Sequence, residues 1–174
     1  VPVVQVEERA VVNATEAPVP TGMLHTLFSG QALERPAQPA VVSPDRILTY
    51  EELFFRSNQV GHRLRQLGAR PNKLVAVVME KGWEQVAAVL GILASGAAYL
   101  PIDAGLPKER LRYLLEHGEV ELVLTQSRLD QSLEWPDGFQ RVCVDDEALT
   151  GVDNHPLDVV QGSEDLAYVI YTSG

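Results

Sequence analysis

Apolar and polar residues alternate in blocks along the second half of the chain, and the blocks have the lengths of strands and helices. Apolar runs of strand length lie at 73–79, 97–103, 120–126 and 141–146. Helical periodicity separates them at 83–95, 107–118 and 128–133. Strands that are apolar on both faces and alternate with helices are typical of a parallel sheet covered on both sides. The pattern therefore predicts a doubly wound α/β fold, whose ligands bind beyond the carboxyl ends of the strands.

The first half of the chain has a different pattern. Residues 1–21 contain three prolines and no steady periodicity, which predicts a linker or an extended arm. A helix is expected over 22–34, followed by two short strands around a turn at 43–45. Thr49 and Glu52 have the spacing of a capping box, which predicts the start of a helix. Gly68 supplies the left-handed stop at which this helix is expected to end.

The chain ends on another apolar run followed by small polar residues. After a polar loop at 149–164, residues 166–171 are expected to form a last buried strand, which delivers Thr172, Ser173 and Gly174 at its carboxyl end. Hydroxyl groups there can donate to phosphate oxygens, and glycine lets the backbone approach an anion closely. The same three residue types are also typical of an ordinary turn.

Composition and charge exclude several classes of protein. The 174 residues suit one domain with a real core, and 45% of them are hydrophobic. A formal net charge of -10 argues against a surface for nucleic acid or anionic membrane, which needs clustered Lys and Arg. No apolar stretch is long enough to span a bilayer and no signal core opens the sequence, so we expect a cytoplasmic protein.

Few residues offer chemistry of their own. Cys143, the single cysteine, lies in a strand-like stretch without a basic partner nearby, so we expect a buried small side chain rather than a nucleophile. The four histidines are scattered and lack zinc-ligand spacing, so no metal site is expected. Neither the dinucleotide fingerprint nor the Walker loop occurs. Gly91 and Gly96 instead suit close helix packing and a helix C-cap.

Three segments, read together, carry a family resemblance. "LTYEEL" (48–53), "LASGAAYLPID" (93–103) and "LAYVIYTSG" (166–174) resemble three successive core motifs of the adenylation domains of nonribosomal peptide synthetases. The segments at 24–42 and 107–126 also look like the family. The combination is specific, although each motif alone is not.

The resemblance implies a domain organisation. "VVNATEAPVP" is similar to the linker that follows a condensation domain, so 1–21 is expected to be that linker. Residues 22–174 are expected to be the N-terminal part of an adenylation domain with the adenylate-forming (acyl-CoA synthetase/luciferase-like) fold, ending inside the phosphate loop. The chain departs from the usual pattern at Gly82–Trp83 and at 94–96, both beside a packing helix and away from the expected chemistry.

The resemblance also implies an activity. Such domains activate an amino or related carboxylic acid with ATP and Mg²⁺, then pass the acyl adenylate to the phosphopantetheine thiol of a carrier domain. Carried over residue by residue, this assigns ATP phosphate contact to Thr172, Ser173 and Gly174, and no catalytic or metal-binding residue to this stretch. The expected partners are the acid, the carrier domain, a neighbouring condensation domain and a small accessory protein, but neither nucleic acid nor membrane. The 174 residues alone are expected to be inactive.

Three alternatives stay open at this point. Another adenylate-forming enzyme, an acyl- or aryl-acid ligase, would share the fold and the phosphate loop. A non-catalytic interaction platform could use the acidic run at 145–147, although such runs are usually solvated surface. A nicotinamide-binding domain would need the missing glycine fingerprint.

Overall fold

The computed structural model describes residues 3–18 and 22–172, and its body is a parallel sheet between two layers of helices. The sheet has four strands in the order β4-β3-β5-β6, and every neighbouring pair is parallel. The strands are β3 (Leu74–Met79), β4 (Ala98–Asp103), β5 (Leu122–Thr125) and β6 (Gln140–Cys143). The predicted α/β fold is confirmed, and so is the alternation of strands and helices from which it was predicted.

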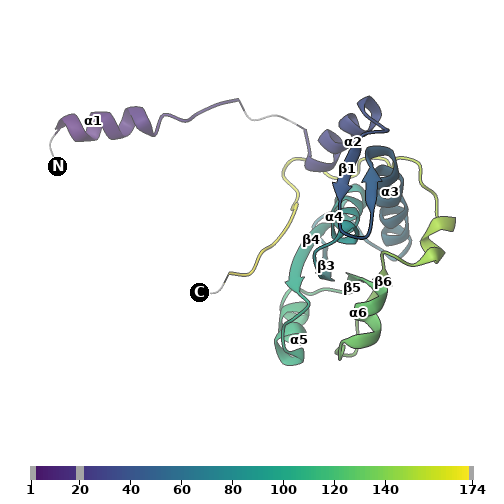
Figure 1. Ribbon diagram of the computed structural model, residues 1–174. Coiled ribbons are helices and arrows are strands. Elements are labelled where there is room, and N and C mark those ends of the chain that lie inside the picture. The colour runs from purple at the N-terminus through teal and green to yellow at the C-terminus, as the bar shows by residue number, and fades with distance from the viewer. Residues whose placement is uncertain (1–2, 19–21, 173–174) are drawn as a thin grey trace.

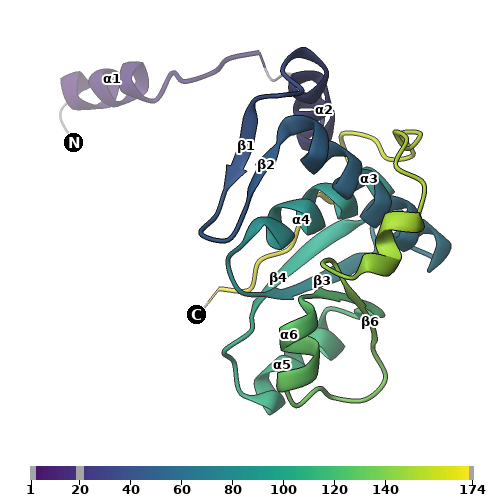
Figure 2. The ribbon, with the colours of Figure 1, turned by 45° about the vertical axis from the view of Figure 1, so that its right-hand side comes forward.

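Helices cover both faces of this sheet (Figures 1 and 2). The helices are α3 (Tyr50–Gln66) and α4 (Trp83–Ser95) on one face, and α5 (Lys108–His117) and α6 (Ser127–Ser132) on the other. Successive side chains of β3 therefore enter different cores: Val75 and Val77 pack with α3 and α4, while Ala76 and Val78 pack with α5. This explains why the strands read as continuous apolar runs.

The N-terminal half packs onto the α3 and α4 layer. α2 (Leu24–Glu34) leads into a hairpin of β1 (Pro39–Val42) and β2 (Ile47–Thr49), which pair antiparallel. The predicted capping box is present, because Glu52 N donates to Thr49 Oγ1 at 3.2 Å and Thr49 N donates to Glu52 Oε2 at 2.8 Å. Gly68, after the helix, has a φ of 95°, as a left-handed stop requires.

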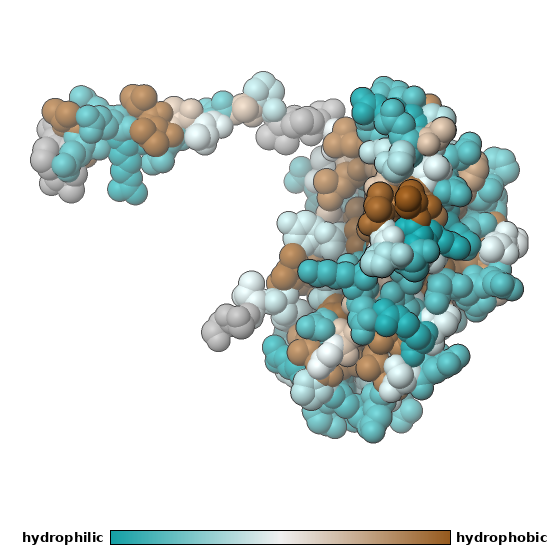
Figure 3. Space-filling view, viewed as in Figure 1, coloured by the Kyte–Doolittle hydropathy of each residue, from teal (hydrophilic) through white to brown (hydrophobic). Residues whose placement is uncertain are grey.

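The structure corrects two expectations, one for each end of the described chain. The first concerns the N-terminal residues, part of which is helical. Residues 1–21 were expected to be a linker or an extended arm. Val3–Val12 forms α1, so this part is helical and not extended, while its role as a linker stays a prediction. Residues 4–18 are all exposed, and α1 stands apart from the body (Figure 1). In Figure 3 its apolar side chains lie open to solvent beside its charged ones. Glutamine, glutamates, arginine and alanine favour a helix here, whereas the many β-branched valines weaken the sequence signal.

The second correction concerns residues 166–171, which do not form a buried strand. In the described part of the chain, their pairing with the sheet is one parallel bridge from Tyr168 to Tyr99, at the outer edge of β4. Leu166, Tyr168 and Ile170 are 47%, 48% and 57% exposed. An apolar run has the same sequence whether one face or both are covered, so periodicity did not distinguish these cases. The polar loop before it contains a short 3₁₀ helix, η1 (Glu147–Gly151).

Within the described ranges, no helix is both long enough and apolar enough to cross a membrane.

Candidate functional site

The carboxyl ends of β3 and β4 border an open cavity. Its volume is about 420 Å³, and it is lined by Met79, Glu80, Lys81, Gln85, Pro101, Ile102 and Asp103. The buried Gln126 accepts a hydrogen bond from Glu80 N at 3.1 Å, and Thr125 Oγ1 donates to Val78 O at 2.9 Å. These contacts fix the chain where it leaves β3. The cavity lies where ligands bind in open α/β sheets.

The expected phosphate contacts lie on the segment at the edge of β4. Thr172 is exposed, and no side-chain hydrogen bond joins it to another described residue. Ser173 and Gly174 lie outside the described residues. The segment joins β4 at Tyr99, near the beginning of that strand, and not at its carboxyl end. The assignment of phosphate contact to these residues therefore stays a prediction.

One anchor holds the start of this segment. Asn72 adopts a left-handed φ of 63°, which Asn tolerates better than most residues. Its Nδ2 donates to Asp165 Oδ1 at 2.6 Å, and its Oδ1 accepts from Leu166 N at 3.0 Å. Asp165 Oδ2 also accepts from Gly162 N at 2.8 Å. These hydrogen bonds lower the pKa of the Asp165 carboxyl from its usual value. The bond from Gly162 N has the largest effect, followed by the bond from Asn72.

A second anchor is the bridge to β4. Tyr99 N donates to Ala167 O at 3.1 Å, and Val169 N donates to Tyr99 O at 3.0 Å. The rings of Tyr99 and Tyr168 lie with their centroids 5.4 Å apart. Burial, and to a lesser extent the neighbouring Tyr168, raises the pKa of the Tyr99 hydroxyl. The Tyr99 hydroxyl therefore stays neutral, and the contact between the two rings helps to fix the register of the segment on the sheet edge.

A third anchor precedes Thr172 directly. The Tyr171 hydroxyl and His117 Nδ1 are hydrogen-bonded at 2.8 Å, and the two rings meet edge to face with centroids 5.6 Å apart. Tyr171 and Val169 pack against the core on the α5 side of the sheet. The three anchors together determine the course of residues 165–171, up to Thr172.

The preceding strap, residues 152–165, is held by polar side chains of α3. Asn58 Nδ2 donates to Asn154 O at 2.9 Å, and His62 Nε2 is hydrogen-bonded to His155 O at 3.0 Å. Arg65 donates to Asp158 O, and also to Ser95 O at 3.0 Å and Ala94 O at 3.2 Å. The three α3 residues are four and three positions apart, so they form one stripe of the helix.

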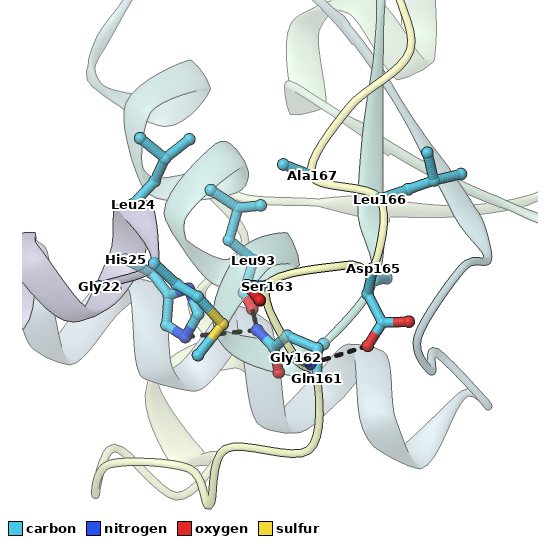
Figure 4. Close-up of a pocket in the computed structure, with 13 residues that line it drawn as sticks. Gly22, Leu24, His25, Leu93, Gln161, Gly162, Ser163, Asp165, Leu166 and Ala167 are labelled. Atoms are coloured by element: carbon cyan, nitrogen blue, oxygen red, sulfur yellow. Dashed lines mark hydrogen bonds between the residues drawn. The ribbon is translucent and has the colours of Figure 1, made fainter. Parts of the chain in front are cut away.

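A smaller cavity, of about 280 Å³, lies between α2 and the strap (Figure 4). Gln161 Nε2 donates to Leu93 O at 2.6 Å, and Gln161 Oε1 accepts from Val160 N at 3.2 Å. Because Gln161 Nε2 can only donate, the buried His25 Nε2, 3.3 Å away, accepts. Burial lowers the pKa of His25, which agrees with a neutral imidazole.

The other side chains singled out in the sequence show no sign of a reactive site in the described part of the chain. Cys143 is half-buried, and burial raises the pKa of its thiol, which disfavours the reactive thiolate. Trp83 is 5% exposed and belongs to the core, with the guanidinium groups of Arg46 and Arg56 over its ring. Among the described residues, no group of three His, Cys, Asp or Glu side chains could hold a metal ion.

Comparison with known proteins identifies the class. Over residues 28–174 the chain matches the family described as AMP-binding enzyme, and it belongs to that family. The curated relatives that it matches include bacitracin, tyrocidine and gramicidin S synthases. The chain is 42% identical over 163 residues to bacitracin synthase 1 of Bacillus licheniformis, covering 93% of this chain and 3% of that protein. It is 37% identical over 160 residues to tyrocidine synthase 2 of Brevibacillus parabrevis, covering 92% and 4%.

Solved structures agree with this relationship. The nonribosomal peptide synthetase FmoA3 superposes with a TM-score of 0.90 at 49% identity, over 95% of this chain and 18% of that chain. A form of FmoA3 with AMPPNP bound gives the same values. The resemblance seen in the sequence motifs is thereby confirmed. The chain spans only a small part of the length of these relatives.

The sequence did not identify the residues that hold the strap and the segment after it in place. Asn72, His117 and the stripe on α3 act through partners 54 to 96 positions away in the chain. A local signal exists for Asn72, since Pro71 and Asn72 suit the two central positions of a type II turn.

Proposed function

We propose that this chain is the N-terminal part of an adenylation domain, which activates an amino or related carboxylic acid for peptide synthesis. The observation that carries the proposal is the match to the AMP-binding enzyme family over residues 28–174, together with 49% identity to a synthetase that has been solved with AMPPNP bound. Thr172 is exposed and follows an anchored segment, so its hydroxyl is available for contact with a ligand.

The proposed reaction uses ATP as a substrate. The carboxylate oxygen of the acid attacks the α-phosphorus, the bond to the bridging oxygen breaks, and pyrophosphate leaves with its electron pair. The carrier thiol then attacks the acyl carbon of the adenylate and releases AMP. Catalysis of such a transfer consists mainly of positioning and of stabilising charge.

The role of this chain in that reaction is to hold phosphate groups. The Thr172 hydroxyl donates to a phosphate oxygen of ATP, and Ser173 and Gly174 continue the contact. Mg²⁺ would neutralise charge on the departing pyrophosphate, and the proposal assigns no residue of this chain to it. The carrier domain, a condensation domain and a small accessory protein are the partners that this proposal implies.

Exchange of labelled pyrophosphate into ATP tests the proposal. The full-length protein is incubated with ATP, labelled pyrophosphate and one acid at a time, with a panel of amino, aryl and fatty acids. Exchange that depends on an amino acid supports the proposal. Exchange only with aryl or fatty acids would identify an acid ligase instead. An intact fold that fails to bind AMPPNP would favour a non-catalytic platform.

A further inference from the structure

The hydrogen bond between Tyr171 and His117 is the last contact before the proposed phosphate-binding residues. It joins the Tyr171 hydroxyl to His117 Nδ1 over 2.8 Å. The backbone hydrogen bonds of this segment to β4 end two residues earlier, at Val169. The side chain of Tyr171 is therefore what holds the chain where it reaches Thr172.

His117 is a fixed point for this contact. It is the last residue of α5, whose Leu114 and Leu115 are buried in the core. Gly118 follows so close to β4 that a Cβ there would come within 2.9 Å of Leu100 Cδ2. The end of α5 is thus tied to the sheet, whereas Tyr171 lies on a segment without regular secondary structure.

The two sides of the segment face different surroundings. Val169 and Tyr171 pack toward the α5 side, while Tyr168 lies against Tyr99, which packs with the opposite core. In a chain with this alternation, holding Tyr171 on the α5 side directs Thr172 to the other side. If the segment shifted by one residue along β4, each of its side chains would move to the opposite side. The Thr172 hydroxyl would then point away from its proposed phosphate contact.

We propose that His117 is a positioning residue for ATP: by holding Tyr171, it sets the direction in which Thr172 meets the phosphates. This inference rests on the proposed function. His117 is exposed and touches no reacting atom, and its effect passes through Tyr171. The contact therefore affects the affinity for ATP and leaves the affinity for the acid unchanged.

The test uses the full-length protein and three variants. Tyr171→Phe removes only the hydroxyl, and His117→Ala removes its partner. Tyr113→Phe is the matched control, because the Tyr113 ring also lies beside His117, at 5.4 Å, but donates no hydrogen bond to a described residue. The measurements are the KM values for ATP and for the acid in pyrophosphate exchange, the Kd for AMPPNP by titration, and the melting temperature.

We expect Tyr171→Phe and His117→Ala each to raise KM for ATP and Kd for AMPPNP about threefold to tenfold, the effect of one lost hydrogen bond. KM for the acid and the Tyr113→Phe control should stay at wild-type values. The double variant should be no worse than either single variant, because both remove the same contact. His117→Asn, whose amide can occupy the position of Nδ1, should restore part of the affinity.

Other results would overturn the inference. A Tyr171→Phe variant with wild-type KM for ATP, in an enzyme that exchanges pyrophosphate normally, overturns the positioning role alone. A lower melting temperature with unchanged nucleotide affinity assigns the contact to stability and overturns it as well. If the wild-type protein neither exchanges pyrophosphate with any acid nor binds AMPPNP, the proposed function fails first, and this inference fails with it.

Discussion

Val60 of α3 packs directly onto the backbone of Gly91 in α4. A Cβ placed on Gly91 would lie 2.6 Å from Val60 Cβ and 2.8 Å from Ser57 O. The two helices can approach so closely only because position 91 has no side chain. This contact joins the layer that covers one face of the sheet, and it agrees with the close-packing role expected for Gly91.

Replacing Gly91 with alanine should therefore destabilise the protein. Alanine is the better helix former by about 1 kcal/mol, but the clash should cost more, and we expect a net loss of about 1–3 kcal/mol. Gly30→Ala in α2 is the matched control, since a Cβ there meets nothing within 4 Å and should stabilise slightly. Urea denaturation of both variants measures the effect, and a change of the same sign in both would contradict this packing.

The capping box at the start of α3 gives a second prediction. Thr49→Ala removes the acceptor of Glu52 N and should lower the free energy of unfolding by about 1 kcal/mol. Thr49→Ser keeps a hydroxyl and should retain most of that stability. Equal losses in both variants, measured by denaturation, would show that the threonine methyl and not the cap is responsible.

Arg65 connects α3, the end of α4 and the strap. Its guanidinium donates to Ala94 O and Ser95 O in the last turn of α4, where orphan carbonyls favour a positive charge, and to Asp158 O. Arg65→Ala should lower the free energy of unfolding by about 2 kcal/mol, because three carbonyl groups lose their donor.

Two further variants separate geometry from charge at this position. Arg65→Lys keeps the charge but not the planar fork, so it should recover only part of the loss. Arg63→Ala, which removes a hydrogen bond to Gln66 in the same helix, should change the stability by less than about 0.5 kcal/mol. Full recovery by lysine would mean that charge alone matters.

His25 should make the stability depend on pH. Burial lowers its pKa in the folded chain from the usual 6.5, so between the two pKa values the unfolded chain binds more protons. The free energy of unfolding should therefore fall as the pH drops below 6.5, and level off below the folded pKa. His25→Gln keeps an acceptor for Gln161 and should lose this part of the pH dependence. An unchanged profile in that variant, measured by denaturation between pH 7.5 and about 5, would contradict the neutral buried state.

The sequence predicted those parts of the fold that depend on neighbouring residues. The strands and helices from Leu74 to Cys143, the capping box at Thr49 and the left-handed Gly96 all follow from local periodicity and backbone preference. Thr172, Ser173 and Gly174 were chosen from a motif. The structure describes only the first of them, so the sequence is still the main evidence for this part of the site.

The parts that the sequence did not predict depend on distant partners. Residues 166–171 read as a buried strand, because an apolar run does not reveal that one face is left open. Asn58, His62 and Arg65 read as ordinary polar positions of an amphipathic helix. Only the fold shows that they hold the strap, more than 90 residues further along the chain.

The central claim is that this chain belongs to a domain that activates an acid with ATP. Acid-dependent pyrophosphate exchange tests it most directly, measured on the full-length protein, on its Thr172→Val variant and on the isolated 174 residues. We predict exchange with an amino or related acid for the full-length protein, and a KM for ATP raised about tenfold or more in the variant, which loses a hydrogen bond to a charged group. The isolated chain should show none. Absence of exchange with every acid by a folded, full-length protein, or robust exchange by the isolated chain, would contradict this account.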